Sequence, residues 1–346
     1  MITHVKRRAR SVLVVAVSAA MLLGVTACTS GQEAASTAQS SGPKSGKLTI
    51  ALLQKQGDQQ YFVDEATGAT AAAKKLGDVD VKVVNLGTDA NKAISEVDSV
   101  IAQKVDGIII VVPDKQIGPQ VISAAKTAGI PIMAADDSIA AADGKEIPFA
   151  GFDGTAMGTL VGAKAAELYL KDGWTAADTR VLSAYKQDQP NCVDRVDGAA
   201  KAFTAGLKGA EAPKIITVGT DNSAPDAQNK AGAVITGNAD VKHWVVWGCN
   251  DENETGVVTA LQNASISPAN INGVGLGAYL TCKDWKAKQD TGNKAALFIS
   301  GVEVGKAAVT SMVDLLRNGK ALPLKSIADT AIVDATNWEK AGVVCT

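Results

Sequence analysis

The sequence predicts an α/β protein of two lobes, each built on a doubly wound parallel sheet, joined by a hinge of several crossings. Short apolar runs alternate with runs of helical apolar spacing from residue 47 to the end of the chain. That alternation is typical of βαβ units. The composition agrees, because 346 residues with 46% hydrophobic but only 4% aromatic side chains suffice for two cores of Val, Ile, Leu and Ala.

The first half of this pattern predicts one lobe. Its opening run, residues 48–53, reads Leu-Thr-Ile-Ala-Leu-Leu, as expected of a strand buried on both faces. In the second helical run, Ile94, Val97 and Ile101 follow the spacing of one helix face. The predicted strands are 48–53, 81–86, 107–112, 131–135 and 148–151, and the predicted helices are 62–76, 91–103 and 116–128.

The pattern then restarts and predicts a second lobe. Its predicted strands are 180–184, 214–218, 243–247, 273–276 and 295–299, and its predicted helices are 155–170, 191–207, 224–236 and 250–262. A long helix at 301–317 and the segment 326–333 end the chain. We expect that last helix to return to the first lobe.

The chain would then cross between the lobes near residues 151, 300 and 328. Several crossings of this kind form a hinge that can close on a ligand. We therefore assign residues 47–152 plus 301–327 to an N-terminal lobe and residues 153–300 plus 328–346 to a C-terminal lobe.

The amino terminus predicts a lipoprotein. In residues 1–27, four basic side chains precede an apolar run at 12–23 that is too short to span a bilayer. The small residues Gly-Val-Thr-Ala before Cys28 resemble a bacterial lipobox, so cleavage would leave Cys28 carrying lipid. The alternative is an ordinary signal peptide with an incidental cysteine. Residues 28–46, rich in Ser, Ala and Gly, predict a flexible tether to the cell membrane outside the cytoplasm.

Charge and cysteine content exclude several classes of function. Removal of the leader takes away four basic residues and no acidic one, which changes the formal charge from −2 to −6 and argues against a nucleic-acid partner. Without a C-x-x-C motif and with one remaining histidine, His243, we expect no metal site and no cofactor. An exported chain can oxidise its remaining cysteines, and three pairings are open among Cys192, Cys249, Cys282 and Cys345.

Polar and aromatic side chains follow the predicted strands at their carboxyl ends, where the ligand crevice of an open α/β sheet lies. The candidates are Lys55, Gln59, Tyr61, Phe62, Asp137, Phe152, Arg195, Asn250 and Tyr279. Asp136 is the weakest candidate, since it could serve only as a cap. Charged and amide groups that bind hydroxyls, together with rings that cover a C–H face, suit a neutral sugar.

The same inventory argues against an enzyme. There is no G-x-S-x-G motif, and His243 opens a predicted strand away from the crevice. Asp136 and Asp137 are adjacent, so we expect their carboxylates to point in different directions. Gly275-Leu276-Gly277 lacks the third glycine of a dinucleotide loop. An exported sugar-acting enzyme is therefore kept only as an alternative.

Together these segments resemble a known family. From about residue 47 to 340, the chain is similar to type I periplasmic binding proteins, closest to the L-arabinose-binding branch of ABC sugar importers. The order and spacing of the pieces carry the resemblance. They are Lys55-Gln56, Tyr61-Phe62, Ala93-Ile94, Asp98-Ser99, Pro113-Asp114 with Gly118, Asp136-Asp137, Gly173-Trp174, Arg195 with Gly198, Val241-Lys242-His243-Trp244 and Asn250-Asp251.

The resemblance implies roles for individual residues. Lys55 matches a sugar-contacting lysine, Asp137 the aspartate near the anomeric hydroxyl, and Arg195 a cleft arginine. Asn250 matches a cleft asparagine, and Tyr61 and Phe62 stand where rings stack on sugar. The departures are Gln59 for a glutamate, Phe152 and Cys249 for methionines, and Tyr279 for a second asparagine. They leave open which aldose is bound, among arabinose, galactose, fucose, xylose and glucose.

The resemblance also implies a function. We expect a monomeric, lipid-anchored solute-binding subunit that captures a monosaccharide and delivers it to an ABC permease. A sensor module that presents the sugar to a chemoreceptor or kinase is the alternative within binding proteins. A transcription-regulator core of the same fold is disfavoured by the export signal and by the missing DNA-binding head.

Overall fold

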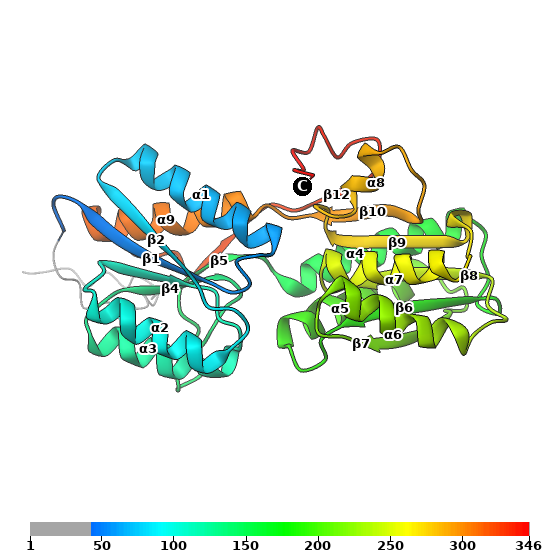
Figure 1. The fold of residues 1–346 in the computed structure, drawn as a ribbon, viewed down its shortest axis with the longest axis horizontal. Helices are drawn as coiled ribbons and strands as arrows, with labels where there is room; N and C mark the ends of the chain where they lie inside the picture. Colours follow the sequence, from blue (N-terminus) through cyan, green and yellow to red (C-terminus); the bar gives the residue numbers. More distant parts are fainter. Residues whose placement is uncertain (1–42, 346) are drawn as a thin grey trace, which may run out of the picture. The chain divides into compact units, whose positions relative to one another are not determined.

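The computed structural model describes residues 43–345, which belong to one compact unit. It contains two six-stranded sheets, each covered by helices on both faces (Figure 1). The predicted fold class, two parallel-sheet α/β lobes, is confirmed. No helix within the described range 43–345 is long and apolar enough to cross a membrane.

The sheet of the first lobe is wholly parallel, in the order β11-β5-β4-β3-β1-β2. Helices α1 and α9 cover one face, and α2 and α3 cover the other (Figure 1). The strands are β1 (Leu48–Gln54), β2 (Val79–Asn85), β3 (Gly107–Ile110), β4 (Ile132–Asp136), β5 (Phe149–Gly151) and β11 (Lys325–Ile327). The helices are α1 (Gln60–Leu76), α2 (Ala90–Ala102), η1 (Lys115–Ile117), α3 (Gly118–Thr127) and α9 (Gly301–Asn318).

The sheet of the second lobe has the order β12-β10-β9-β8-β6-β7, and only its edge strand β12 is antiparallel. Helices α4 and α5 pack on one face, and α6 and α7 on the other. The strands are β6 (Thr179–Tyr185), β7 (Lys214–Gly219), β8 (His243–Gly248), β9 (Ile271–Gly277), β10 (Asn293–Phe298) and β12 (Ala331–Val333). The helices are α4 (Gly154–Lys171), α5 (Pro190–Gly206), α6 (Ala224–Thr236), α7 (Asp251–Asn263), η2 (Pro268–Asn270) and α8 (Cys282–Lys286).

The last part of the chain differs most from the sequence prediction. Residues 326–333 form two three-residue strands, and β11 and β12 belong to different sheets. Strands this short carry no readable period, and the five-residue helix α8 was missed for the same reason. The backbone N–H of Ala328, between these strands, donates to the Gly151 carbonyl at 2.8 Å. Two of the expected crossing points are therefore hydrogen-bonded to each other.

Glycines bring pairs of helices into backbone contact. A Cβ at Gly158 of α4 would lie 1.9 Å from the Arg195 carbonyl oxygen of α5. A Cβ at Gly305 of α9 would lie 2.0 Å from the Glu65 carbonyl oxygen of α1. Both distances are far inside van der Waals contact, so no larger residue fits without moving a helix. The α4–α5 contact thereby fixes the backbone that carries Arg195.

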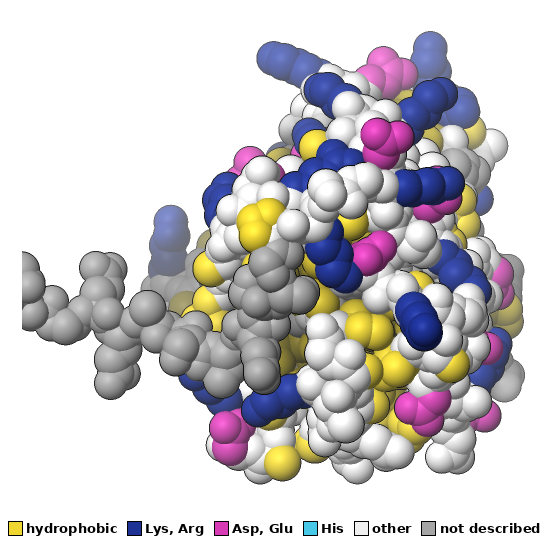
Figure 2. Space-filling view, turned by 90° about the vertical axis from the view of Figure 1, so that its left-hand side faces the viewer, with side chains coloured by type: hydrophobic (Ala, Val, Ile, Leu, Met, Phe, Trp, Pro, Cys, Tyr) yellow, Lys and Arg dark blue, Asp and Glu magenta, His cyan; other side chains and the backbone are white. Residues whose placement is uncertain are grey.

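The surface of the first lobe is mixed in charge. On the face that Figure 2 shows, basic and acidic side chains are interspersed with small apolar areas. Such mixing is normal for a domain that is exposed to water.

We predict that Gly158→Ala lowers the free energy of unfolding by about 2 kcal/mol, because overpacking forces the α4 and α5 backbones apart. Gly232→Ala in α6 is the matched control, since a Cβ there meets no atom within 4 Å. Alanine in an open helix position is expected to stabilise by about 0.5–1 kcal/mol. Urea denaturation measures both variants, and a Gly158→Ala protein as stable as the wild type would contradict the close packing.

Candidate functional site

A cavity lies where the carboxyl ends of strands from both sheets meet. The first lobe contributes Lys55, Gln56, Gln59, Tyr61, Phe62 and Asp136 to its lining. The second lobe contributes Gln189, Asn191, Cys192, Arg195, Asn222, Cys249, Asn250, Leu276 and Tyr279, and Ile299 comes from the segment that joins β10 to α9. Most of these side chains are polar or aromatic, and several of the polar ones, such as Lys55, Asp136 and Arg195, are buried.

Lys55 is the central cation of the first-lobe side. It follows β1 and is 6% exposed. Its Nζ donates to Asp137 Oδ2 at 3.1 Å and lies 3.9 Å from Asp136 Oδ2. Asp137 Oδ2 also accepts from Asn191 Nδ2, on α5 of the second lobe, at 2.8 Å. Asp137 is therefore held by protein groups from both lobes and does not line the cavity.

The two adjacent aspartates were expected to diverge, and that expectation is wrong. Asp136 has a φ of +61°, and the Asp137 N–H donates to the Ala135 carbonyl at 2.7 Å. This tight turn brings both carboxylates within reach of Lys55. Asp136 lines the cavity, while Asp137 lies behind it.

The environment separates the pKa values of these two carboxyls. Burial raises the pKa of Asp136, and the charge of Asp137 raises it further. Burial acts on Asp137 as well, but Lys55, Arg195 and Lys115 outweigh it and lower the pKa of Asp137. Asp137 is thus the fixed anion of the pair.

Glu65 lies behind Asp136 in the same cluster. Burial, with Asp136 as the next cause, raises the pKa of Glu65 well above its usual range, which favours its uncharged form. Charged groups of both signs lie around the cavity: the cations Lys55 and Arg195, the two aspartates, and the Glu252 carboxyl behind Tyr279. Such a mixture suits a polar ligand without net charge.

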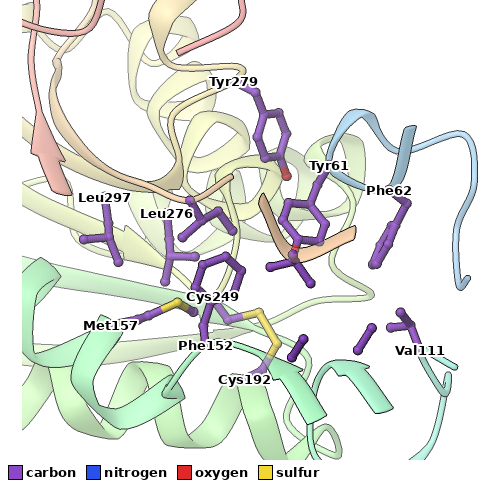
Figure 3. Close-up of a cluster of buried hydrophobic side chains, with 14 of the residues drawn as sticks. Tyr61, Phe62, Val111, Phe152, Met157, Cys192, Cys249, Leu276, Tyr279 and Leu297 are labelled. Carbon is purple, nitrogen blue, oxygen red and sulfur yellow. A yellow bond between two sulfur atoms is a disulfide. The ribbon is translucent and has the colours of Figure 1, made fainter. Parts of the chain in front are cut away.

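Aromatic rings form the apolar part of the first-lobe side (Figure 3). Tyr61 and Phe62 meet edge to face with centroids 5.1 Å apart, and Phe152 lies 6.3 Å from Tyr61. Phe152 belongs to the apolar cluster behind the cavity and does not line it. The Tyr61 hydroxyl is buried and, among residues 43–345, has no partner in good hydrogen-bond geometry. The Asp136 carboxyl lies near enough to this hydroxyl to raise the pKa of Tyr61, after burial as the main cause.

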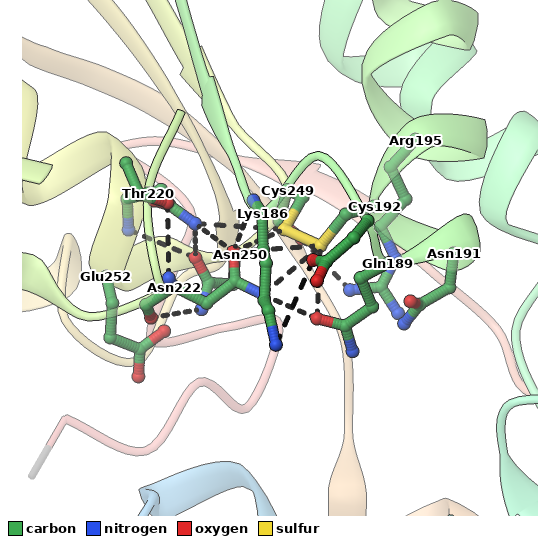
Figure 4. Close-up of a disulfide and its surroundings, with 12 residues drawn as sticks. Lys186, Gln189, Asn191, Cys192, Arg195, Thr220, Asn222, Cys249, Asn250 and Glu252 are labelled. Atoms are coloured by element: carbon green, nitrogen blue, oxygen red, sulfur yellow. Dashed lines mark hydrogen bonds and ion pairs between the residues drawn. A yellow bond between two sulfur atoms is a disulfide. The ribbon is translucent and has the colours of Figure 1, made fainter. Parts of the chain in front are cut away.

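The second-lobe wall is a network of amides centred on Asn222 (Figure 4). Asn222 Oδ1 accepts from the Lys186 N–H at 3.0 Å and from Asn253 Nδ2 at 2.9 Å, and its Nδ2 donates to Gln189 Oε1 at 2.7 Å. Its carbonyl accepts from Asn250 Nδ2 at 3.1 Å. The loops after β6, β7 and β8 are thereby fixed to one another.

Arg195 projects from α5 beside this network. Its Nη1 donates to the Cys249 carbonyl at 3.0 Å. Its Nε is buried and, among the described residues, meets no acceptor. An unpaired guanidinium N–H in a buried cavity is costly unless a ligand accepts from it.

Comparison with known proteins shows the family to which the chain belongs. Residues 50–321 match the model of a periplasmic binding protein domain. The chain belongs to the periplasmic binding protein family.

The relatives of this periplasmic binding protein agree with the resemblance inferred from sequence, which is confirmed. It is 27% identical over 298 residues to the ABC transporter L-arabinose-binding periplasmic protein of Azospirillum brasilense, covering 84% of this chain and 88% of that one. It is 26% identical over 257 residues to the L-arabinose-binding periplasmic protein of Escherichia coli K12, covering 73% and 77%.

Solved structures share its fold. A periplasmic solute-binding protein from Actinobacillus succinogenes with bound D-allose has a TM-score of 0.73 at 22% identity, covering 85% of this chain and 100% of that one. The Caulobacter myo-inositol-binding protein has a TM-score of 0.73 at 20% identity, covering 87% and 98%.

Two disulfides resolve the pairing that the sequence of this binding protein left open. Cys192 bonds to Cys249 with their Cα atoms 4.9 Å apart, and both residues line the cavity. Cys282 bonds to Cys345 with Cα atoms 5.8 Å apart, which ties the end of the chain to α8. The first bridge joins the start of α5 to the loop after β8, the two segments that carry Arg195 and Asn250.

The structure brings most of the predicted ligand residues together. Those that line the cavity are Lys55, Gln59, Tyr61, Phe62, Arg195, Asn250 and Tyr279. Asp137 and Phe152 lie one layer behind, and Cys28 lies outside the described residues. Contact of any of them with a ligand stays a prediction. Within the described range 43–345, no cluster of three or more His, Cys, Asp or Glu side chains could hold a metal.

Several lining residues were missed. They are Gln56, Gln189, Asn191 and Asn222, and Asp136 was considered mainly as a cap. A usable signal existed for Asn222, because it follows the predicted strand 214–218 and the carboxyl-end rule applies there too. Asn191 sits in the first turn of α5, which faces the same edge of the sheet.

We predict that Lys55→Met destabilises the protein by about 3 kcal/mol at pH 7, because it leaves two buried aspartates without their counter-charge. The pKa of Asp137 is lowered in the folded state, so its contribution to stability is present at neutral pH and is lost only as pH falls below its ordinary range. The loss caused by the variant should therefore stay large down to about pH 4 and shrink only at lower pH. Urea denaturation across this pH range measures it.

Lys47→Met is the matched control. Lys47 pairs with Asp80 on the surface, where both side chains are at least 60% exposed, and exposed pairs contribute little. Equal stability loss in the two variants would show that the buried cluster does not depend on Lys55.

Proposed function

We propose that this chain is the lipid-anchored solute-binding subunit of an ABC importer that captures a monosaccharide. The single observation that carries the proposal is the cavity. It combines charged groups of both signs with aromatic rings, and it offers a buried donor, Arg195 Nε, that lacks a partner among residues 43–345. A neutral molecule with many hydroxyls and one C–H face suits that combination.

The comparisons support a ligand of monosaccharide size. The two curated relatives described above are named for L-arabinose, and structures of the same fold hold D-allose or myo-inositol. We therefore infer an arabinose-like or galactose-like aldose. We expect the lining residues Gln59 and Tyr279 to determine which aldose is bound, because both depart from the pattern of the arabinose-binding branch.

We further propose that the ligand is held between the two lobes assigned from sequence, residues 47–152 plus 301–327 and residues 153–300 plus 328–346. The side-chain bond from Asn191 to Asp137 already links their two sides of the cavity. The crossings at 151, 300 and 328 would act as the hinge. Delivery to a membrane permease and anchoring by lipid on Cys28 complete the proposal, with the chain acting outside the cytoplasm as a monomer and without catalysis.

A thermal-shift screen of the purified protein against aldoses tests the proposal. A ligand that binds only the folded state stabilises it by about 2.7 kcal/mol at a concentration of 100 Kd, so the melting temperature should rise with one or two monosaccharides. Amino acids serve as the negative panel. If no aldose shifts the melting temperature, the proposal is wrong, and polyols and nucleosides are the next classes to screen.

Arg195→Ala is predicted to weaken binding of the identified sugar by about 2 kcal/mol or more, because a charged donor to the ligand is lost. Arg180→Ala is the control, since its guanidinium donates to the carbonyls of residues 176, 177 and 179 and does not line the cavity. Isothermal titration calorimetry measures both. Unchanged affinity in Arg195→Ala would remove this residue from the site.

A further inference from the structure

Tyr279 and Glu252 form a hydrogen-bonded pair at the edge of the cavity. The Tyr279 hydroxyl donates to the Glu252 carboxylate, whose Oε2 and Oε1 lie 2.8 and 3.0 Å away. The Tyr279 ring lines the cavity and is 6% exposed. Glu252 itself does not line it, so this carboxylate acts on a ligand through the lining side chains that it contacts, the Tyr279 phenol and Gln59.

The loop that carries Tyr279 is shaped to hold this pair. Gly277 has a φ of +141°, and a Cβ there would lie 2.4 Å from Tyr279 Cε1, so the ring folds back over a position that only glycine can occupy. Asp251 accepts from the N–H groups of Leu280 and Thr281 at 2.8 and 3.2 Å. The first turn of α7 therefore holds the loop at two points. Asp251 binds the loop backbone, and Glu252 binds the Tyr279 phenol.

The hydrogen bond to Glu252 limits what Tyr279 can offer a ligand. A phenol has a single proton, and here that proton is directed at a carboxylate. Only the oxygen lone pairs of Tyr279 remain for the cavity. They can accept from a ligand hydroxyl, but they cannot donate to an ether or carbonyl oxygen.

We propose that Glu252 is a positioning residue that makes Tyr279 an obligate hydrogen-bond acceptor, so that this point of the cavity selects a sugar hydroxyl and rejects the deoxy or O-alkyl sugar at the same carbon. The inference rests on the proposed sugar-binding function and adds a determinant of specificity to it. Discrimination of this kind is strong, because the analogue leaves a buried polar atom unpaired.

Burial and the neighbouring charges make Glu252, rather than Tyr279, the member of the pair that titrates near neutral pH. Burial, which is the largest cause, and the charge of Asp251 raise the pKa of Glu252 to about 7, while its own backbone N–H, the Tyr279 hydroxyl and Gln59 act in the opposite direction. Burial, Glu252 and Asp251 raise the pKa of Tyr279 well above its usual range, against a smaller effect of Arg195. The phenol therefore keeps its proton throughout.

Protonation of Glu252 would reverse the pair. A protonated carboxyl can donate to the Tyr279 oxygen and occupy the lone pair that a sugar hydroxyl needs. Because the raised pKa places this change near neutrality, the selective form is present above about pH 7 and is lost as the pH falls through that value.

The test uses four proteins: wild type, Glu252→Gln, Tyr279→Phe and the double variant. Their affinities are measured at pH 8 for the aldose that stabilises the wild type and for its monodeoxy analogues. We expect one analogue to bind the wild type about tenfold more weakly than the parent sugar. Each single variant should bind the parent sugar about tenfold more weakly and lose the discrimination at that carbon. The double variant should be no weaker than Tyr279→Phe.

The pH dependence of sugar affinity distinguishes this role of Glu252 from a merely structural one, which would not make affinity follow the protonation of Glu252. Affinity of the wild type for the parent sugar should fall between pH 8 and pH 6, and the profile of Glu252→Gln should be flat over the same range. Glu167→Gln is the control, because Glu167 lies on α4 with a side chain that is 63% exposed. It should keep the wild-type profile. Because Gln has nearly the volume of Glu, this comparison remains decisive even where Tyr279→Phe unfolds.

Three results would overturn the inference, and they differ in scope. A wild type that binds aldoses, together with single variants that keep full affinity and discrimination, overturns the role of Glu252 alone. A pH dependence that persists in Glu252→Gln does the same. A wild type that binds no aldose overturns the proposed function, and this inference falls with it.

Discussion

The buried ion pair between Lys55 and Asp137 is the interaction on which the rest of the site depends. Both side chains are less than a tenth exposed, and removing two charges from water costs several kcal/mol per ion. Good geometry and further hydrogen bonds must offset that cost. Here Asn191 supplies one of them from the second lobe. The stability of the first-lobe side of the cavity and its link to the second lobe therefore rest on the same carboxylate.

In the second lobe, hydrogen bonds between amide side chains offset the cost of placing polar groups in the cavity wall. Asn222, Gln189, Asn250 and Asn253 hydrogen-bond to one another across three loops, and the Cys192–Cys249 bridge closes the network covalently. Neutral amides have a lower desolvation cost than charges, so this wall can be rigid without strong ion pairs. Arg195, a cation that lines this wall, is anchored by a backbone carbonyl and keeps part of its guanidinium for the cavity. The first-lobe side thus depends mainly on paired charges, and the second-lobe side mainly on neutral amides.

The sequence predicted those features that depend on periodicity and strand ends. The apolar run at 48–53, the return of helix 301–317 to the first sheet, and long polar side chains such as Lys55 and Arg195 all follow from such rules. What it could not show depends on single backbone angles and on strand order. Asp136 has a φ of +61° and Asn222 a φ of +72°. Asp and Asn adopt this conformation more readily than most residues, but the sequence does not show which of its many Asp and Asn residues do so. The pairing of Cys192 with Cys249 follows only once β6 and β8 are known to be neighbours.

The unpaired polar groups in the cavity connect stability to selectivity. Among the described residues, Arg195 Nε is buried without a partner, and the Tyr61 hydroxyl has only the Asp136 carboxyl near it. A buried polar group that is left unpaired destabilises the free protein by about 1–3 kcal/mol. A ligand that bonds these groups recovers this free energy on binding. A ligand that lacks the matching hydroxyl does not, and it also displaces the water that would otherwise partly satisfy them. The unpaired polar groups that destabilise the ligand-free protein therefore also let it discriminate among sugars. Substitutions that gave these groups a partner within the protein would stabilise it but would reduce that discrimination.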